Sequence, residues 1–86
     1  MDIAVLIIDL LRRRMTDASL CPSEVARTLA AGNAPWRPLM QPVRDAAGAL
    51  ARADVIRITQ GERTLDPGDI DRGPIRLRRG TAFPDA

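Results

Sequence analysis

Arginine is the residue type in this chain that is best suited to binding chemistry. All 13 basic residues of the 86-residue sequence are arginine, and 11 acidic residues bring the net charge to +2. The guanidinium group makes bidentate contacts to phosphate and guanine that lysine does not make. A GC-rich genome would produce the same bias towards arginine, and so small a net charge does not by itself predict a nucleic-acid partner.

Residues that usually carry catalysis or bind metals are scarce. The sequence has no histidine and a single cysteine, Cys21. It therefore lacks the common general base, and it cannot form a multi-thiolate metal site or an internal disulfide. Because it also has no nucleophile–base set and no glycine-rich phosphate loop, we expect no enzymatic activity, no cofactor and no metal. The thiol of Cys21, just before a predicted helix, is either reactive or a small apolar residue at the helix cap.

Aspartates gather in a segment rich in proline and glycine. Asp66, Asp69 and Asp71 are close enough in sequence to bind a cation. Their spacing does not match that of an EF-hand calcium loop. The order Asp-Pro-Gly-Asp over residues 66–69 is more typical of a turn in which side chains accept hydrogen bonds from nearby backbone amides.

Hydrophobic periodicity predicts three helices followed by two strands. The helices span residues 2–15, about 22–31 and 39–53, the strands span 55–60 and 75–79, and residues 16–21 form a connection. Pro22 fits the first turn of the second helix, and Gly32 fits its left-handed end. Pro38 and Pro42 disturb the third helix, so we expect an irregular turn from Trp36 before a regular helix from residues 40–41. Trp36 either anchors this corner in the core or stacks on a ligand.

This order of elements is that of a winged helix-turn-helix domain of the α+β class. Three helices precede a two-stranded antiparallel hairpin, which would be the wing. We predict a single domain over residues 1–79 and a flexible tail over residues 80–86. No stretch reaches the roughly 18 apolar residues of a membrane span, and the first residues lack the basic start of a secretory signal. We therefore expect a cytoplasmic protein.

The arginines fall where a winged helix contacts DNA. The side chains expected to face the major groove from the third helix are Arg37, Gln41 and Arg44. Those expected to hold backbone phosphates from the wing are Arg76, Arg78 and Arg79, with Arg57 on the same outward face. We therefore predict a DNA-binding, transcription-regulatory domain whose partner is double-stranded DNA.

The loop between the two strands argues against this prediction. Over residues 61–73 its charge is −2, from Glu62, Asp66, Asp69 and Asp71 against Arg63 and Arg72. A wing tip of that sign would be repelled by phosphate. The alternative is a protein–protein interaction module of the same fold that binds no nucleic acid.

The apolar face of the first predicted helix is too wide for one small core. It covers about half of the helical circumference, whereas a surface helix needs a little over 100°. Val5, Ile8 and Met15 lie at the margins of that face and would remain uncovered. An uncovered apolar patch predicts a homodimer through the first helix.

Four stretches resemble an uncharacterised bacterial family of winged-helix type. They are CPSEVARTLA (21–30), WRPLMQPVRDAAGALA (36–51), IRITQGERTLDP (56–67) and RGPIRLRR (72–79). The resemblance spans nearly the whole chain and implies a winged-helix fold. Because the function of that family is unknown, DNA binding is implied only by analogy with other winged helices.

Overall fold

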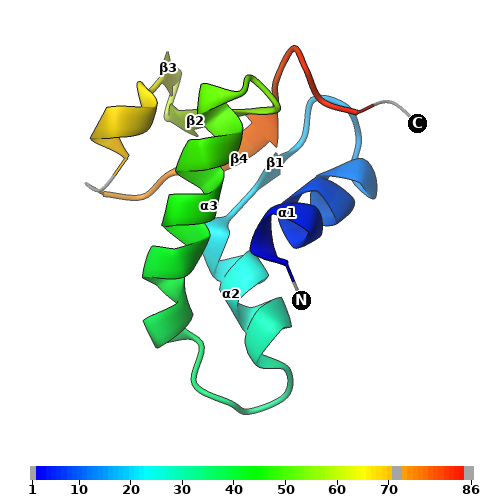
Figure 1. Ribbon diagram of the computed structural model, residues 1–86, viewed down its shortest axis with the longest axis vertical. Coiled ribbons are helices and arrows are strands. Elements are labelled where there is room, and N and C mark those ends of the chain that lie inside the picture. The colour runs from blue at the N-terminus through cyan, green and yellow to red at the C-terminus, as the bar shows by residue number, and fades with distance from the viewer. Residues whose placement is uncertain (1, 71–72, 85–86) are drawn as a thin grey trace.

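The computed structural model describes residues 2–70 and 73–84 as a small α+β domain (Figure 1). The elements are α1 (Ile3–Arg12), β1 (Ser19–Leu20), α2 (Pro22–Ala30), the 3₁₀ helix η1 (Arg37–Leu39), α3 (Met40–Arg52), β2 (Ile56–Gln60), β3 (Arg63–Thr64), the 3₁₀ helix η2 (Pro67–Asp69) and β4 (Arg76–Arg79). Their order is consistent with a winged-helix-like arrangement, so the predicted fold class is confirmed. Among the described residues, no helix has the length and apolar character to cross a membrane.

The first helix is capped by Asp2 and is shorter than predicted. The Asp2 side chain accepts hydrogen bonds from the backbone N–H groups of Ala4 (2.8 Å) and Val5 (3.3 Å). These are donors that the first turn of a helix leaves unpaired. Because α1 ends at Arg12, Met15 lies in the turn that follows and does not extend the apolar face of the helix.

Prolines set the starts of the next two helices as predicted. Pro22 is the first residue of α2. The irregular turn before α3 is the 3₁₀ helix η1, and α3 begins at Met40. Pro42 therefore falls in the first turn, where the missing N–H breaks no hydrogen bond within the helix. The backbone turns after α2 at Ala31 and Gly32, with φ values of 58° and 56°.

The sheet is larger than the predicted hairpin. Its strand order is β1-β4-β2-β3, all antiparallel, so β4 lies between β1 and β2. Strand β1 lies in the predicted connection over residues 16–21, and β3 lies in the predicted loop over residues 61–73. Each is two residues long, too short to show an alternating pattern, and each forms by pairing with a longer strand. The predicted hairpin is thus the centre of the sheet.

The core lies between one face of this sheet and the helices, and Figure 1 shows α3 running across the sheet. Leu20, Ile58 and Leu77 are cross-strand neighbours on the core face, and each is at most 1% exposed. Side chains that alternate with them belong to the opposite face. We call this opposite surface the sheet face; its residues are Ser19, Arg57, Thr59, Thr64, Arg76 and Arg78.

The long loop after β3 folds back onto α3. Ile70 is 5% exposed, and its Cδ1 would lie 3.4 Å from a Cβ placed on Gly48 of α3. The Asp66 side chain accepts a hydrogen bond from the N–H of Gly68 (2.9 Å), which confirms the predicted turn. In the described part of the chain, no group of three or more histidine, cysteine or acidic residues could hold a metal ion. Asp71, which also belonged to the predicted acidic loop, lies outside the described residues, as does Arg72.

Residues 80–84 are packed, whereas the sequence analysis expected a flexible tail. The N–H groups of Gly80 and Ala82 donate to the carbonyl oxygens of Val55 (3.0 Å) and Asp54 (2.8 Å). Phe83 is only 7% exposed. An aromatic ring that reaches the core provides apolar burial that holds such a segment in place. Residues 85–86 of the expected tail lie outside the described residues.

Candidate nucleic-acid interface

The sheet face brings together arginines from two neighbouring strands. Arg57 and Arg78 are directly opposed across β2 and β4, and Arg76 is opposite Thr59. Like charges that face each other in this way repel. Both ion pairs found among the described residues involve other arginines. Within that part of the chain, the sheet face is therefore a patch of positive charge without a paired carboxylate.

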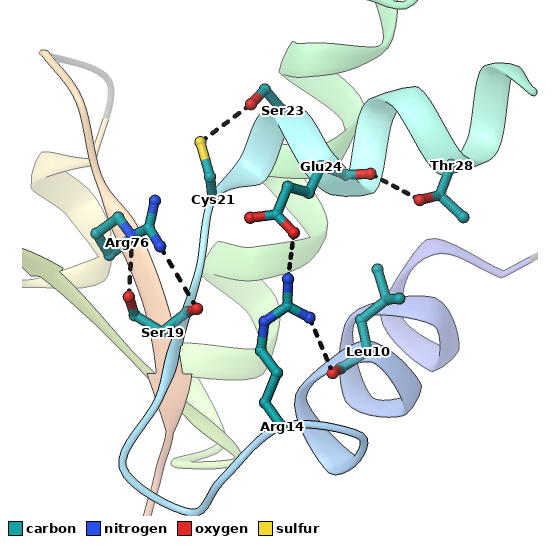
Figure 2. A network of polar contacts seen from close by, with 8 residues as sticks. All are labelled: Leu10, Arg14, Ser19, Cys21, Ser23, Glu24, Thr28 and Arg76. Carbon is teal, nitrogen blue, oxygen red and sulfur yellow. Dashed lines mark hydrogen bonds and ion pairs between the residues drawn. The ribbon is translucent and has the colours of Figure 1, made fainter.

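Neutral oxygen atoms hold two of these arginines in place. Arg76 donates from Nε to Ser19 Oγ (2.9 Å) and from Nη2 to the Ser19 carbonyl oxygen (3.5 Å), and Figure 2 shows it reaching across from β4 to β1. Arg78 donates from Nη1 to the carbonyl oxygen of Asp17 (2.8 Å) and from Nε to Thr59 Oγ1 (3.3 Å). Uncharged acceptors orient the guanidinium groups without neutralising them.

Within the described part of the chain, Arg57 donates one hydrogen bond, from Nε to the carbonyl oxygen of Arg79 (3.3 Å). A guanidinium group has five N–H donors. All three arginines of the sheet face therefore retain donors for a ligand.

Arg79, expected to contact phosphate, serves the interior instead. It lies two residues after Leu77 and so on the core side of β4. Its Nη2 donates to three carbonyl oxygens at the end of α1, those of Leu11 (3.1 Å), Arg12 (3.3 Å) and Arg14 (3.0 Å). Its guanidinium carbon lies 4.7 Å from the centroid of the Phe83 ring. Because side chains alternate along a strand, the sequence already indicated that Arg79 lies on the core side. Arg79 is therefore not part of the candidate interface.

Arg44, expected in the major groove, fastens the long loop onto α3. Its Nη1 donates to the carbonyl oxygen of Ile70, and its Nη2 donates to that of Gly73 (3.1 Å). Together with Ile70 against Gly48, these bonds place the loop over the middle of α3. Arg37 and Gln41 remain exposed at the start of the helix.

A second basic surface lies at the connection between α2 and α3. The guanidinium carbons of Arg27 and Arg37 lie 4.5 and 4.6 Å from the ring centroid of Trp36, within the range of cation–π attraction. Trp36 itself is partly buried against the core, so its predicted role as an anchor is confirmed. We call Arg27, Trp36 and Arg37 the turn cluster.

The sequence marks the turn cluster by a lack of acidic residues around it. Between Glu24 and Asp45 the chain contains no acidic residue. Gln41 follows the cluster on the exposed side of α3, where its Nε2 donates to Asp45 Oδ1 (2.9 Å). Arg27 was not among the predicted site residues, although this acid-free stretch would have included it.

Cys21 lies next to the sheet face at the start of α2 (Figure 2). Its Sγ is 3.0 Å from Ser23 Oγ, and its side chain makes no capping hydrogen bond. Burial and, to a smaller extent, the Glu24 carboxylate raise the pKa of the Cys21 thiol, but hydrogen bonding with Ser23, helped by the charge of Arg76, outweighs them and lowers it overall. The charge on Arg76 is therefore one of several influences on this thiol.

These elements and surfaces define a small α+β domain with a winged-helix-like arrangement. The chain belongs to a family of proteins of unknown function, DUF3253, whose model matches residues 1–80. No curated protein matches the chain. Family membership therefore assigns no activity, and a function has to be argued from the surfaces themselves.

Proposed function

We propose that this domain binds double-stranded DNA through the turn cluster and the exposed start of α3. The observation that carries the proposal is that Arg27 and Arg37 share one tryptophan ring within a stretch free of acidic residues. Two cations beside one ring, in a stretch without acidic residues, favour a polyanion as partner. Duplex DNA is such a polyanion because of its phosphates.

A neighbouring side chain suits a contact to a base edge. Glutamine pairs with adenine in the major groove, and Gln41 is exposed beside the turn cluster at the start of α3. The bond from Gln41 to Asp45 is itself exposed, so the amide can exchange partners. A domain that binds duplex DNA in this way fits a transcription-regulatory protein and needs no catalytic group.

The test is fluorescence anisotropy of a labelled mixed-sequence duplex, titrated with protein from about 50 to 200 mM salt. We expect binding that weakens linearly on a plot of log affinity against log salt. Arg37→Gln should reduce the slope by about one, because one phosphate contact is lost. Arg52→Gln removes the same charge from the exposed end of α3 and serves as the matched control.

Two outcomes would refute the proposal. One is no binding by the unsubstituted protein at low salt with protein up to about 100 μM, the weak end of non-specific affinity. The other is an Arg37→Gln protein that loses no more affinity than Arg52→Gln.

A second candidate function is self-association through α1. Val5 is 60% exposed and lines a shallow groove with Leu6, Ile8, Asp9, Arg12 and Pro84. An uncovered apolar groove on one helix is a surface that a symmetric dimer can bury against the same groove of a second copy. Sedimentation velocity at micromolar concentration should show a dimer that Val5→Glu dissociates. A monomer at every concentration would exclude this candidate.

A further inference from the structure

We infer that the sheet face is a second nucleic-acid surface, which binds the phosphodiester backbone whatever its sequence. The inference rests on the proposed function for its class of partner, but on different residues. Arg57, Arg76 and Arg78 project from one face, and no ion pair joins them to a carboxylate in the described part of the chain. Three such charges on one small face attract a polyanion more strongly than a single free anion.

The spacing of the arginines suits a chain of repeated charges. Arg76 and Arg78 are two residues apart on β4, about 6.6 Å at the strand rise. One strand of DNA carries a phosphate about every 3.4 Å along the helix axis. The pair on β4 therefore spans the rise of about two phosphates, and Arg57 stands beside Arg78 across the sheet.

The sheet face lacks the side chains that other partners would need. Protein interfaces depend on buried aromatic or apolar anchors, but the residues on this face other than arginine are Ser19, Thr59 and Thr64. Binding to bases of a single strand relies on stacking against aromatic rings. The two aromatic residues of the chain, Trp36 and Phe83, both belong to other parts of the structure. The backbone is the part of a nucleic acid that this face fits.

The arginines are also held ready for a ligand. Hydrogen bonds to Ser19, Thr59 and the Asp17 carbonyl fix Arg76 and Arg78. A side chain that is already ordered loses less conformational entropy when it binds. Because the acceptors are neutral, this order is achieved without loss of charge.

The first experiment compares salt dependence for a single-stranded oligonucleotide and for the matched duplex. Arg76→Gln should reduce the slope by about 0.7 on the single strand and about 0.9 on the duplex, and Arg57→Gln should do the same. Arg76→Lys keeps the charge and should restore most of the slope. Thermal melting confirms that each variant is folded. If Arg76→Gln and Arg57→Gln both match the Arg52→Gln control on both probes, the inference is refuted.

The second experiment uses Cys21 to locate the ligand. Alkylation by iodoacetamide near neutral pH requires the thiolate, which the charge of Arg76 favours. A phosphate bound at Arg76 should offset that charge, so a saturating single strand should slow the alkylation of Cys21. Arg76→Gln should slow alkylation without any ligand and should abolish the effect of the oligonucleotide. An alkylation rate that saturating oligonucleotide leaves unchanged would overturn the inference.

These two experiments separate the inference from the proposed function. Failure of the turn cluster is seen as an Arg37→Gln protein with unchanged duplex binding, while the Arg76 variant and Cys21 still respond. Failure of the sheet face is seen as the reverse pattern. Each surface can therefore be refuted without refuting the other.

Discussion

Replacing Arg79 by methionine should destabilise the domain strongly. The guanidinium group closes the C-terminal end of α1 through three carbonyl oxygens at 3.0–3.3 Å and stacks on Phe83 at 4.7 Å. Carbonyl groups at the end of a helix have no partner within it, and a cation there also interacts favourably with the helix dipole. Methionine keeps most of the apolar stem and removes these contacts.

The magnitude follows from the bonds that are lost. One Nη2 group has two hydrogens, so its three contacts amount to about two hydrogen bonds of about 1.5 kcal/mol each. Stacking on Phe83 adds about 0.5–1 kcal/mol. Nε of Arg79 is buried with no partner in the described part of the chain. Removing this unsatisfied donor increases the stability by about 1 kcal/mol and offsets part of the loss. The net loss is about 2–3 kcal/mol, which in a domain of this size lowers Tm by about 10–20 °C.

The assay is thermal and urea denaturation followed by circular dichroism. Arg12→Met, at the exposed end of α1, is the matched control and should change stability by less than about 0.5 kcal/mol. Arg79→Lys keeps a cation that can reach the carbonyl oxygens and should recover part of the loss. If Arg79→Met is as stable as Arg12→Met, Arg79 does not close the helix and the reasoning is wrong.

Three other changes test separate parts of the structure. Asp2→Ala removes the cap of α1 and should lower the free energy of unfolding by about 1 kcal/mol. Urea denaturation measures this change, and an unchanged free energy of unfolding would show that the cap is unimportant. Gly80→Ala places a Cβ against the carbonyl oxygen of Asp54, so the backbone must shift. We expect a loss of stability of about 1–3 kcal/mol, as for other overpacked sites, and a thermal melt like that of the unsubstituted protein would contradict this contact. The alkylation rate of Cys21 should reach half its maximum at a lower pH than the rate of an ordinary thiol, because the pKa of Cys21 is lowered. Arg76→Gln should move that midpoint to higher pH. An unchanged midpoint would exclude the proposed influence of Arg76.

The sequence predicts the long elements of this fold well, because their signals are local. Helical periodicity locates the three helices, and the two prolines at residues 38 and 42 predict the irregular entry to α3. The short strands β1 and β3 are invisible in the sequence, since two residues show no period and their partners are remote. Ser19 pairs with Arg78, and that register exists only once the sheet has formed. The same holds for Phe83, whose burial depends on neighbours distant in sequence.

The candidate site is predictable in part, for a related reason. Sequence pattern shows which arginines lie on helices and strands, but not which carbonyl oxygens they meet. Arg44 bonds to the loop 26 and 29 residues away, so its apparent freedom on the helix wheel is lost in the fold. Arg27 was overlooked because its partner ring, Trp36, lies on the other side of a turn.

Neighbouring arginines on β4 show how position, and not residue type, decides between structure and binding. Arg78 and Arg79 follow each other, so they point to opposite faces of the sheet. Arg79 meets helix carbonyl oxygens that need a donor, and its charge serves the folded state. Arg78 meets the neutral oxygens of Asp17 and Thr59 on the open face, which orient its charge without neutralising it. A register shift of one residue would exchange these roles, placing an unneeded charge in the core and leaving the end of α1 open. The pairing of β4 with β1 and β2 therefore determines which of the arginines present their charge on the sheet face.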